Sequence, residues 1–109
     1  MTFKNFFELA KSTPVNRIGY TKEYTWRGYS LHIYNTKRQV NIIDDDDLAE
    51  VAIVDAGDEY HIYRSTRRGY INYDSYESYS ADDNIYDVFN SVCEKKYIEA
   101  VSIVNDEVA

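Results

Sequence analysis

The chain has 109 residues, one cysteine and a formal net charge of −7, and 44% of its residues are hydrophobic. This length fits one domain, residues 1–109, and a lone cysteine excludes an intramolecular disulfide and favours a reducing compartment. The first residues lack the apolar run of a signal peptide and no stretch is long enough to cross a bilayer, so we expect a cytoplasmic protein with no membrane partner.

The charge is unevenly divided along the sequence. Residues 1–41 contain seven basic residues (Lys and Arg) and two acidic residues (Asp and Glu). Residues 42–109 contain five basic and seventeen acidic residues. The densest acidic stretch contains no Lys or Arg, and its acids are Asp44, Asp45, Asp46, Asp47, Glu50, Asp55, Asp58 and Glu59. The electrostatic field of such a charged stretch affects binding partners and solubility, but it does not determine the fold.

The first expected element is a short helix that Thr2 caps and that runs through Lys11. Its apolar residues recur at helical spacing and are Phe3, Phe6, Phe7 and Ala10. Pro14 ends the helix, because the residue before a proline is pushed out of the α region.

Short antiparallel strands are expected from Arg17 to about Tyr73. Alternating or continuous apolar patterns, separated by turn signals, predict strands over residues 29–34, 39–43, 48–54, 59–64 and 70–73. The nearly continuous apolar run over residues 48–54 is typical of a central strand. We therefore expect a meander of about four to six strands.

A second helix is expected after Asp82 or Asp83, either of which can cap it. One apolar face at 3.6-residue spacing contains Ile85, Val88, Phe89, Val92, Cys93 and Tyr97. Residues 97–104 fit either a continuation of this helix, which we slightly favour, or a last strand. The fold class is α+β, an antiparallel sheet flanked by an N-terminal and a C-terminal helix.

The run of four aspartates from Asp44 has three interpretations: a solvated loop, an imitation of nucleic-acid phosphates, or a divalent-cation site. It fails the EF-hand pattern, since Leu48 and Ala49 stand where a further oxygen ligand is needed. We therefore predict no metal site, and no motif indicates a cofactor.

Tyrosine recurs every third residue at Tyr70, Tyr73, Tyr76 and Tyr79. With Ser, Asn and acids between them, these tyrosines have the composition of a protein-binding loop. The alternative is a connecting loop whose rings lie over the sheet. Stacking on nucleic-acid bases is disfavoured, because neighbouring acids repel phosphates.

Two other groups of residues are candidates for chemistry. Cys93 with His32 and His61 would be a thiol nucleophile with a base, but Cys93 falls on the apolar helix face, where we expect a buried, inert thiol and hence no enzyme. The basic residues of the first part, interleaved with Tyr20, Tyr24 and Trp26, form either a nucleic-acid face or solvated strand positions; they are Arg17, Lys22, Arg27, Lys37 and Arg38.

The layout of residues 1 to about 98 resembles small accessory proteins of Gram-positive phages and prophages, some of which are anti-CRISPR inhibitors. The resemblance lies in the opening helix over residues 3–11, the segments Tyr-Thr-Trp-Arg-Gly-Tyr and Val-Ala-Ile-Val, and the capped closing helix. It implies a stoichiometric inhibitor in the host cell cytoplasm and assigns no functional residue.

We therefore expect a non-enzymatic acidic protein that blocks a nucleic-acid-handling host defence enzyme, such as a CRISPR effector nuclease, at its basic surface. The alternatives are a self-associating regulatory or structural subunit, such as a homodimer, and a nucleic-acid-binding module that uses the basic N-terminal part. The predicted partner-binding residues are Asp44, Asp45, Asp46, Asp47, Glu50, Asp55, Asp58, Glu59, Tyr70, Tyr73, Tyr76 and Tyr79.

Overall fold

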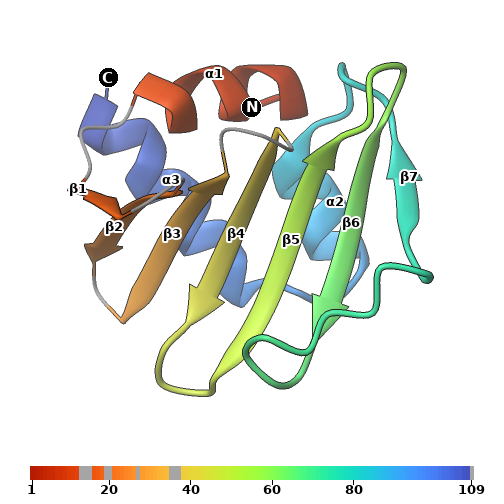
Figure 1. Ribbon diagram of the computed structural model, residues 1–109. Helices are drawn as coiled ribbons and strands as arrows, with labels where there is room; N and C mark the ends of the chain where they lie inside the picture. Colours follow the sequence, from red (N-terminus) through yellow and green to blue (C-terminus); the bar gives the residue numbers. More distant parts are fainter. Residues whose placement is uncertain (13–15, 19–20, 27, 35–37, 109) are drawn as a thin grey trace.

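An antiparallel sheet with helices on one side makes up the fold (Figure 1). The computed structural model describes residues 1–12, 16–18, 21–26, 28–34 and 38–108. For residues 12, 16–18, 21–26 and 103–108 it describes the backbone but not the side chains. In these ranges, seven strands lie side by side in chain order: β1 (Asn16–Ile18), β2 (Thr21–Trp26), β3 (Tyr29–Tyr34), β4 (Gln39–Asp44), β5 (Ala49–Asp55), β6 (Tyr60–Ser65) and β7 (Glu77–Tyr79).

The predicted α+β class is confirmed. Five of the described strands have six or seven residues, and the two edge strands have three each. The expected strand over residues 70–73 is wrong: that segment belongs to the connection between β6 and β7. The strand was predicted there because tyrosines are closely spaced in this segment. Tyrosine has a high β-propensity because its ring packs well on a sheet surface, and here the segment lies over the sheet instead of forming one of its strands.

In the described part of the chain, three helices cover one face of the sheet: α1 (Phe3–Ser12), α2 (Ile85–Ser91) and α3 (Lys96–Val108). As predicted, Thr2 caps α1, since its Oγ1 accepts the N–H of Asn5 at 3.1 Å. The cap of α2 is Asn84 and not Asp82 or Asp83: its side-chain oxygen accepts the N–H groups of Tyr86 and Asp87.

The second helical region breaks, so that residues 97–104 are helical but belong to a separate helix. The N–H of Cys93 bonds to the carbonyl of Asn90, and that of Glu94 to the carbonyl of Phe89, which ends α2. Cys93 takes the left-handed conformation (φ 63°) that such an ending requires. The periodicity continued across this break, which is why the sequence favoured one long helix.

The core lies between the sheet and the helices. Strand alternation sends Leu31, Ile42, Val51 and their neighbours towards the helices, where they meet the phenylalanines of α1. The first residue of the chain is hydrogen-bonded to the start of α2, since the N–H of Ile85 donates to the carbonyl of Met1 at 2.8 Å. We call the opposite side of the sheet the outer face; its residues include His32, Asn41 and Tyr63.

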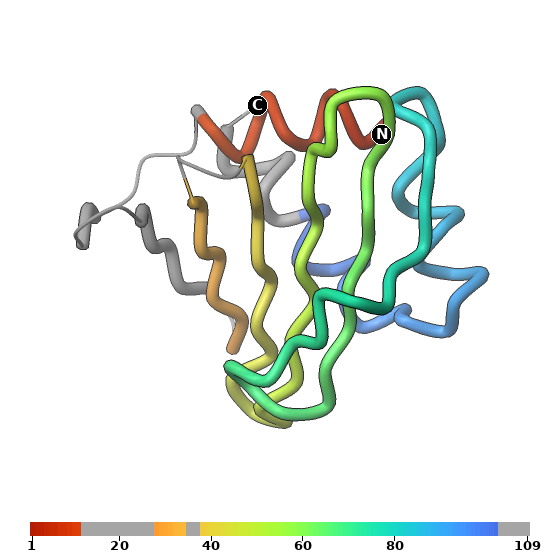
Figure 2. The backbone as a smooth tube through the Cα atoms, turned by 45° about the vertical axis from the view of Figure 1, so that its right-hand side comes forward, coloured from red at the N-terminus to blue at the C-terminus, as the bar shows by residue number. Residues whose placement is uncertain are grey.

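The connection between β6 and β7 crosses this outer face (Figure 2). We call residues 66–76 the tyrosine loop. The loop begins at the end of the sheet where β4 turns into β5, which we call the lower end; the β5–β6 turn lies at the opposite, upper end (Figure 1).

Candidate functional site

The aspartate run forms a tightly built turn at the lower end, which we call the acidic turn (residues 44–48). Asp44 is the last residue of β4 and is only 8% exposed; its Oδ1 accepts the backbone N–H groups of Asp46 at 3.1 Å and Asp47 at 3.3 Å. The N–H of Asp45 donates to the carbonyl of Gly28 in the neighbouring β2–β3 turn. The segment is therefore an ordered turn between β4 and β5, held by hydrogen bonds to its own backbone and to Gly28.

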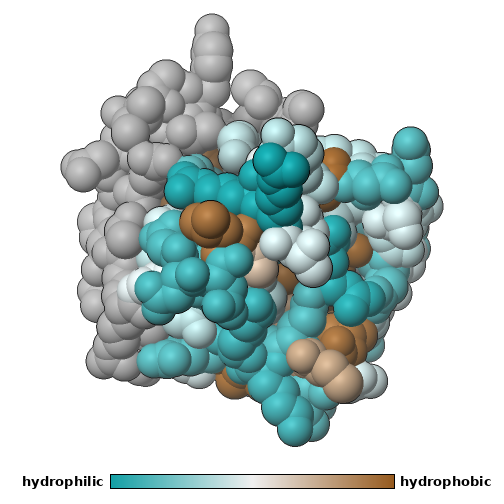
Figure 3. All heavy atoms as spheres, turned by 90° about the horizontal axis from the view of Figure 1, so that it is seen from below, coloured by the Kyte–Doolittle hydropathy of each residue, from teal (hydrophilic) through white to brown (hydrophobic). Residues whose placement is uncertain are grey.

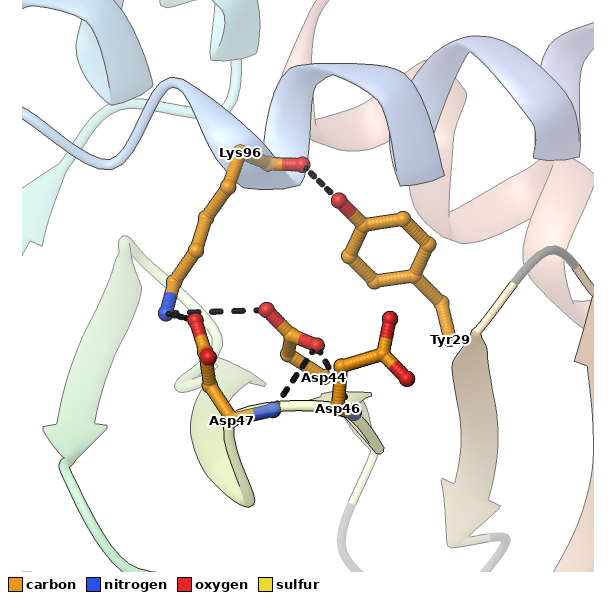
Figure 4. A network of polar contacts seen from close by, with 5 residues as sticks. All are labelled: Tyr29, Asp44, Asp46, Asp47 and Lys96. Carbon is orange, nitrogen blue, oxygen red and sulfur yellow. Dashed lines mark hydrogen bonds and ion pairs between the residues drawn. The ribbon is translucent and has the colours of Figure 1, made fainter.

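Two cations from distant parts of the chain lie within ion-pair distance of three of the four aspartates. Lys96 at the start of α3 lies 3.7 Å from Asp44 and 3.5 Å from Asp47 (Figure 4). Arg68 of the tyrosine loop lies 3.7 Å from Asp45, whose other oxygen accepts the hydroxyl of Ser30. Both of these basic partners come from the acidic part of the sequence, Lys96 from α3 and Arg68 from the tyrosine loop.

Asp46 and Asp47 are the members of the run that remain exposed. The Asp46 carboxylate points away from Lys96 in Figure 4, and it lies close to Gly28, where an added Cβ would be 3.1 Å from its oxygen. The hydroxyl of Tyr29 donates to the carbonyl of Lys96 at 2.7 Å, and burial together with the surrounding carboxylates raises the pKa of this tyrosine.

The other predicted acids do not join this surface. Asp55, Asp58 and Glu59 lie at the upper end, a full strand length away, because β5 separates them from the acidic turn. Asp55 lies 3.8 Å from Arg38, and Glu59 bonds to His61, which lowers the pKa of the Glu59 carboxyl. The acidic stretch is continuous in sequence but divided in space.

Glu50 is separated from both ends. It lies on the outer face within β5, next to Ile43 and Ser65 in the strand register, and is 5% exposed. A side chain so deeply buried cannot contact a partner without rearrangement, so its predicted role as a contact residue does not fit this position.

The tyrosine loop carries an ordered aromatic cluster on the outer face. Tyr76 stacks on His61 with ring centres 4.0 Å apart, and Tyr63 contacts the rings of Tyr73 and Tyr76. The Tyr73 hydroxyl accepts a hydrogen bond of 2.9 Å from Gln39 on β4. The loop thus lies over the sheet, yet Tyr73 and Tyr76 remain 52% and 50% exposed.

Tyr70 and Tyr79 behave differently from this pair. Tyr70, at the lower end, is 64% exposed, and the guanidinium of Arg67 lies 4.1 Å from its ring centre. Tyr79 belongs to β7 and faces the helices, where it stacks on Phe3. The threefold spacing therefore distributes the four rings over different surroundings, and Tyr79 is part of the core periphery.

A largely buried acid that the sequence analysis did not single out lies near the lower end. Glu94 lines a pocket of about 410 Å³ together with Arg64, Cys93 and Lys96, and its Oε2 has no hydrogen-bond partner among the described residues. Burial raises the pKa of Glu94 to about 7, although Arg64, 3.7 Å away, and Lys96 oppose this shift. No sequence pattern singles out Glu94, because it lies between Cys93 and Lys95 in a segment of ordinary charged composition.

Cys93 is exposed and not buried, which corrects the sequence-based expectation. The helix ends before it, so the face that would have buried the thiol does not extend that far. His32 and His61 lie on the outer face, across the sheet from Cys93, so the three residues do not form a nucleophile with its base.

The basic N-terminal surface falls mainly outside the described residues. Arg27 and Lys37 lie in segments that are not described, and the side chains of Arg17 and Lys22 are likewise outside the description. Of this set, Arg38 is described, and it pairs with Asp55.

Across the part of the chain that the structure covers, no group of three or more His, Cys, Asp or Glu side chains is arranged to hold a metal ion. Nor does any described helix have the length and apolar character needed to cross a bilayer. Comparison with family models, curated proteins and solved structures finds no match to this chain.

Proposed function

We propose that this protein is a non-enzymatic binding protein that inhibits a nucleic-acid-handling enzyme, such as a CRISPR effector nuclease, by occupying its basic surface. One observation carries the proposal: Tyr73 and Tyr76 are held in fixed positions on the outer face and still expose half of their surface. Tyrosines of this kind are typical hot-spot residues, since they bring a large contact area at low entropic cost.

The acidic turn belongs to the same proposed binding surface as the tyrosine loop. It adjoins the tyrosine loop through the contact between Arg68 and Asp45, and it presents Asp46 and Asp47 to solvent. Carboxylates at the edge of an aromatic surface accelerate encounter with a basic partner and disfavour other partners. The surface that we propose is therefore smaller than the sequence implied: the acidic turn with Tyr70, Tyr73 and Tyr76.

Inhibition of DNA cleavage by a purified, guide-RNA-loaded CRISPR effector nuclease tests the proposal. We expect stoichiometric inhibition by the wild-type protein, and a loss of affinity of roughly tenfold or more for Tyr73→Ala and Tyr76→Ala. Tyr86→Ala, which removes a ring from α2 on the helix side of the sheet, is the matched control and should inhibit like the wild type.

Circular dichroism and thermal unfolding of each variant separate loss of binding from loss of fold. Absence of both complex formation and inhibition by the folded wild-type protein would contradict the proposal. A stable homodimer in sedimentation that leaves nuclease activity unchanged would favour the self-associating subunit, and a gel shift of nucleic acid at low salt would favour direct binding.

A further inference from the structure

Arg64, in β6, lies between two carboxylates from different parts of the chain. It pairs with Glu77, the first residue of β7, and its Nε also lies 3.7 Å from Oε1 of Glu94. The same side chain lines two pockets, one of about 410 Å³ with Glu94 and one of about 290 Å³ with Tyr76 and Glu77. The guanidinium therefore has room to move and a carboxylate in each direction.

The pair between Arg64 and Glu77 holds the place where the tyrosine loop joins β7. Glu77 directly follows Tyr76 in the chain, and its second oxygen accepts the hydroxyl of Tyr79 at 2.7 Å. β7 has three residues, and within the described sheet it pairs with β6 alone. So short an edge strand has few backbone hydrogen bonds, and side-chain contacts such as this pair therefore matter for keeping it in place.

The contact between Arg64 and Glu94 is incomplete. At 3.7 Å it is an ion pair that is too long for a hydrogen bond, and Oε2 of Glu94 is buried with no hydrogen-bond partner among the described residues. A protonated carboxyl is tolerated in such surroundings, whereas a buried carboxylate without a donor is costly. An ionised Glu94 therefore needs a donor that it does not have in the structure.

Of the groups around Glu94, Arg64 is the one placed to respond to its ionisation. The titratable and charged groups there come from β6, β7, α3 and the connection before α3, and they are Arg64, Glu77, Tyr79, Cys93, Lys96 and Tyr97. Lys96 is already paired with two aspartates of the acidic turn. Both tyrosines stay uncharged at neutral pH, because burial raises the pKa of their hydroxyls.

We propose that Arg64 changes partners with the protonation state of Glu94 and thereby controls how firmly β7 and the end of the tyrosine loop are held. While Glu94 carries its proton, Arg64 holds Glu77; when Glu94 ionises, the guanidinium shifts to Glu94 and releases Glu77. Seen from below, the lower end is largely hydrophilic with small separate hydrophobic areas, which suits a carboxylate released to solvent (Figure 3).

The direction of the pH effect follows from linkage. The conformation with Arg64 on Glu77 binds the proton of Glu94 more tightly than the conformation with Arg64 on Glu94, so a rising pH favours release. Burial raises the pKa of Glu94 to about 7, which places the change near neutral pH. Tyr76, next to Glu77, should therefore be held more firmly in mildly acidic solution.

Amide hydrogen exchange of the full chain, with no partner present, tests the proposal. After correction for the intrinsic pH dependence of exchange, protection of residues 77–79 in the wild type should fall at least about fivefold between pH 6 and pH 8. Glu94→Gln should keep high protection at both pH values, and Glu77→Gln should show low protection at both. Asp87→Asn, a matched charge change at an exposed position of α2, should behave like the wild type.

An NMR titration of the wild type provides a measurement that needs no variant. The carboxyl carbon of Glu94 and the amides of β7 should titrate with one common midpoint near pH 7. Separate midpoints, equal protection of β7 at pH 6 and pH 8, or a fall that persists in Glu94→Gln would overturn the proposal. A change confined to residues 44–48 would also overturn it, because it would show that Lys96 and not Arg64 moves to Glu94.

Discussion

Glu94 is a residue whose ionisation opposes folding at neutral pH. Its side chain is 13% exposed, and burial raises its pKa from 4.5 to about 7 in the folded protein. Because the folded state holds the proton more tightly than the unfolded chain, the stability linked to Glu94 is complete below about pH 4.5 and is lost as the pH rises through 7. The expected loss is roughly 3 kcal/mol.

We therefore expect Glu94→Gln to remove this component of the pH dependence and to raise the free energy of unfolding at pH 8 by up to roughly 3 kcal/mol. Urea unfolding of both proteins between pH 4.5 and pH 8 measures the difference. Equal slopes against pH for the two proteins, or an NMR titration of the Glu94 carboxyl near pH 4.5, would contradict the prediction.

Single residues also show where sequence patterns stop being informative. The spacing of Cys93 continues an apolar helix face, but hydrogen bonds at the end of α2 place it in a left-handed, exposed position. Asn84, and not the adjacent aspartates, caps α2, because Asp83 instead accepts the N–H of Ser80. At each of these positions, alternative local hydrogen bonds have similar energies, so the sequence pattern does not show which of them forms.

Two turns act together as one element at the lower end. The carbonyl of Gly28 in the β2–β3 turn accepts the N–H of Asp45, and the Asp46 carboxylate lies over the glycine. Gly28 has φ +84°, so a side chain there would both strain the backbone and push Asp46 away. The acidic turn thus depends on a glycine from a neighbouring hairpin.

This dependence predicts that Gly28→Ala destabilises the protein by roughly 2 kcal/mol, from left-handed strain and displacement of Asp46. Gly57→Ala is the matched control, because Gly57 has φ +97° and an added Cβ would have no atom of the described residues within 4 Å. Its cost should be only about 1 kcal/mol. Thermal unfolding measures both variants, and equal destabilisation would show that Asp46 imposes no constraint on Gly28.

At the scale of the whole molecule, folding changes what the net charge of −7 means. The acids that are continuous in sequence are separated to opposite ends of the sheet, and several are paired with Lys96, Arg68 or Arg38. The field near each end is therefore set by a few exposed carboxylates, and the two ends can be tested separately.

We expect Asp46→Asn and Asp47→Asn to slow association with the CRISPR effector nuclease by roughly threefold each at low salt, since rim charges act mainly on the on-rate. Asp58→Asn at the upper end makes the same charge change and should leave the on-rate nearly unchanged. Stopped-flow or surface-plasmon measurements at two salt concentrations decide this. A larger effect of Asp58→Asn would assign the partner to the upper end.

Local sequence signals were enough to predict the α+β class, the first helix with its Thr2 cap, and most strands, because apolar alternation and helix capping depend on residues that are neighbours in the chain. Three properties depend on the folded structure: which acids are paired, which tyrosines stay exposed, and that Glu94 is largely buried with one oxygen that has no hydrogen-bond partner among the described residues. These properties depend on contacts between residues far apart in sequence, such as Lys96 with Asp44 and Tyr73 with Gln39. Local periodicity carries no information on these long-range contacts, because they depend on which side chains the fold brings close together in space.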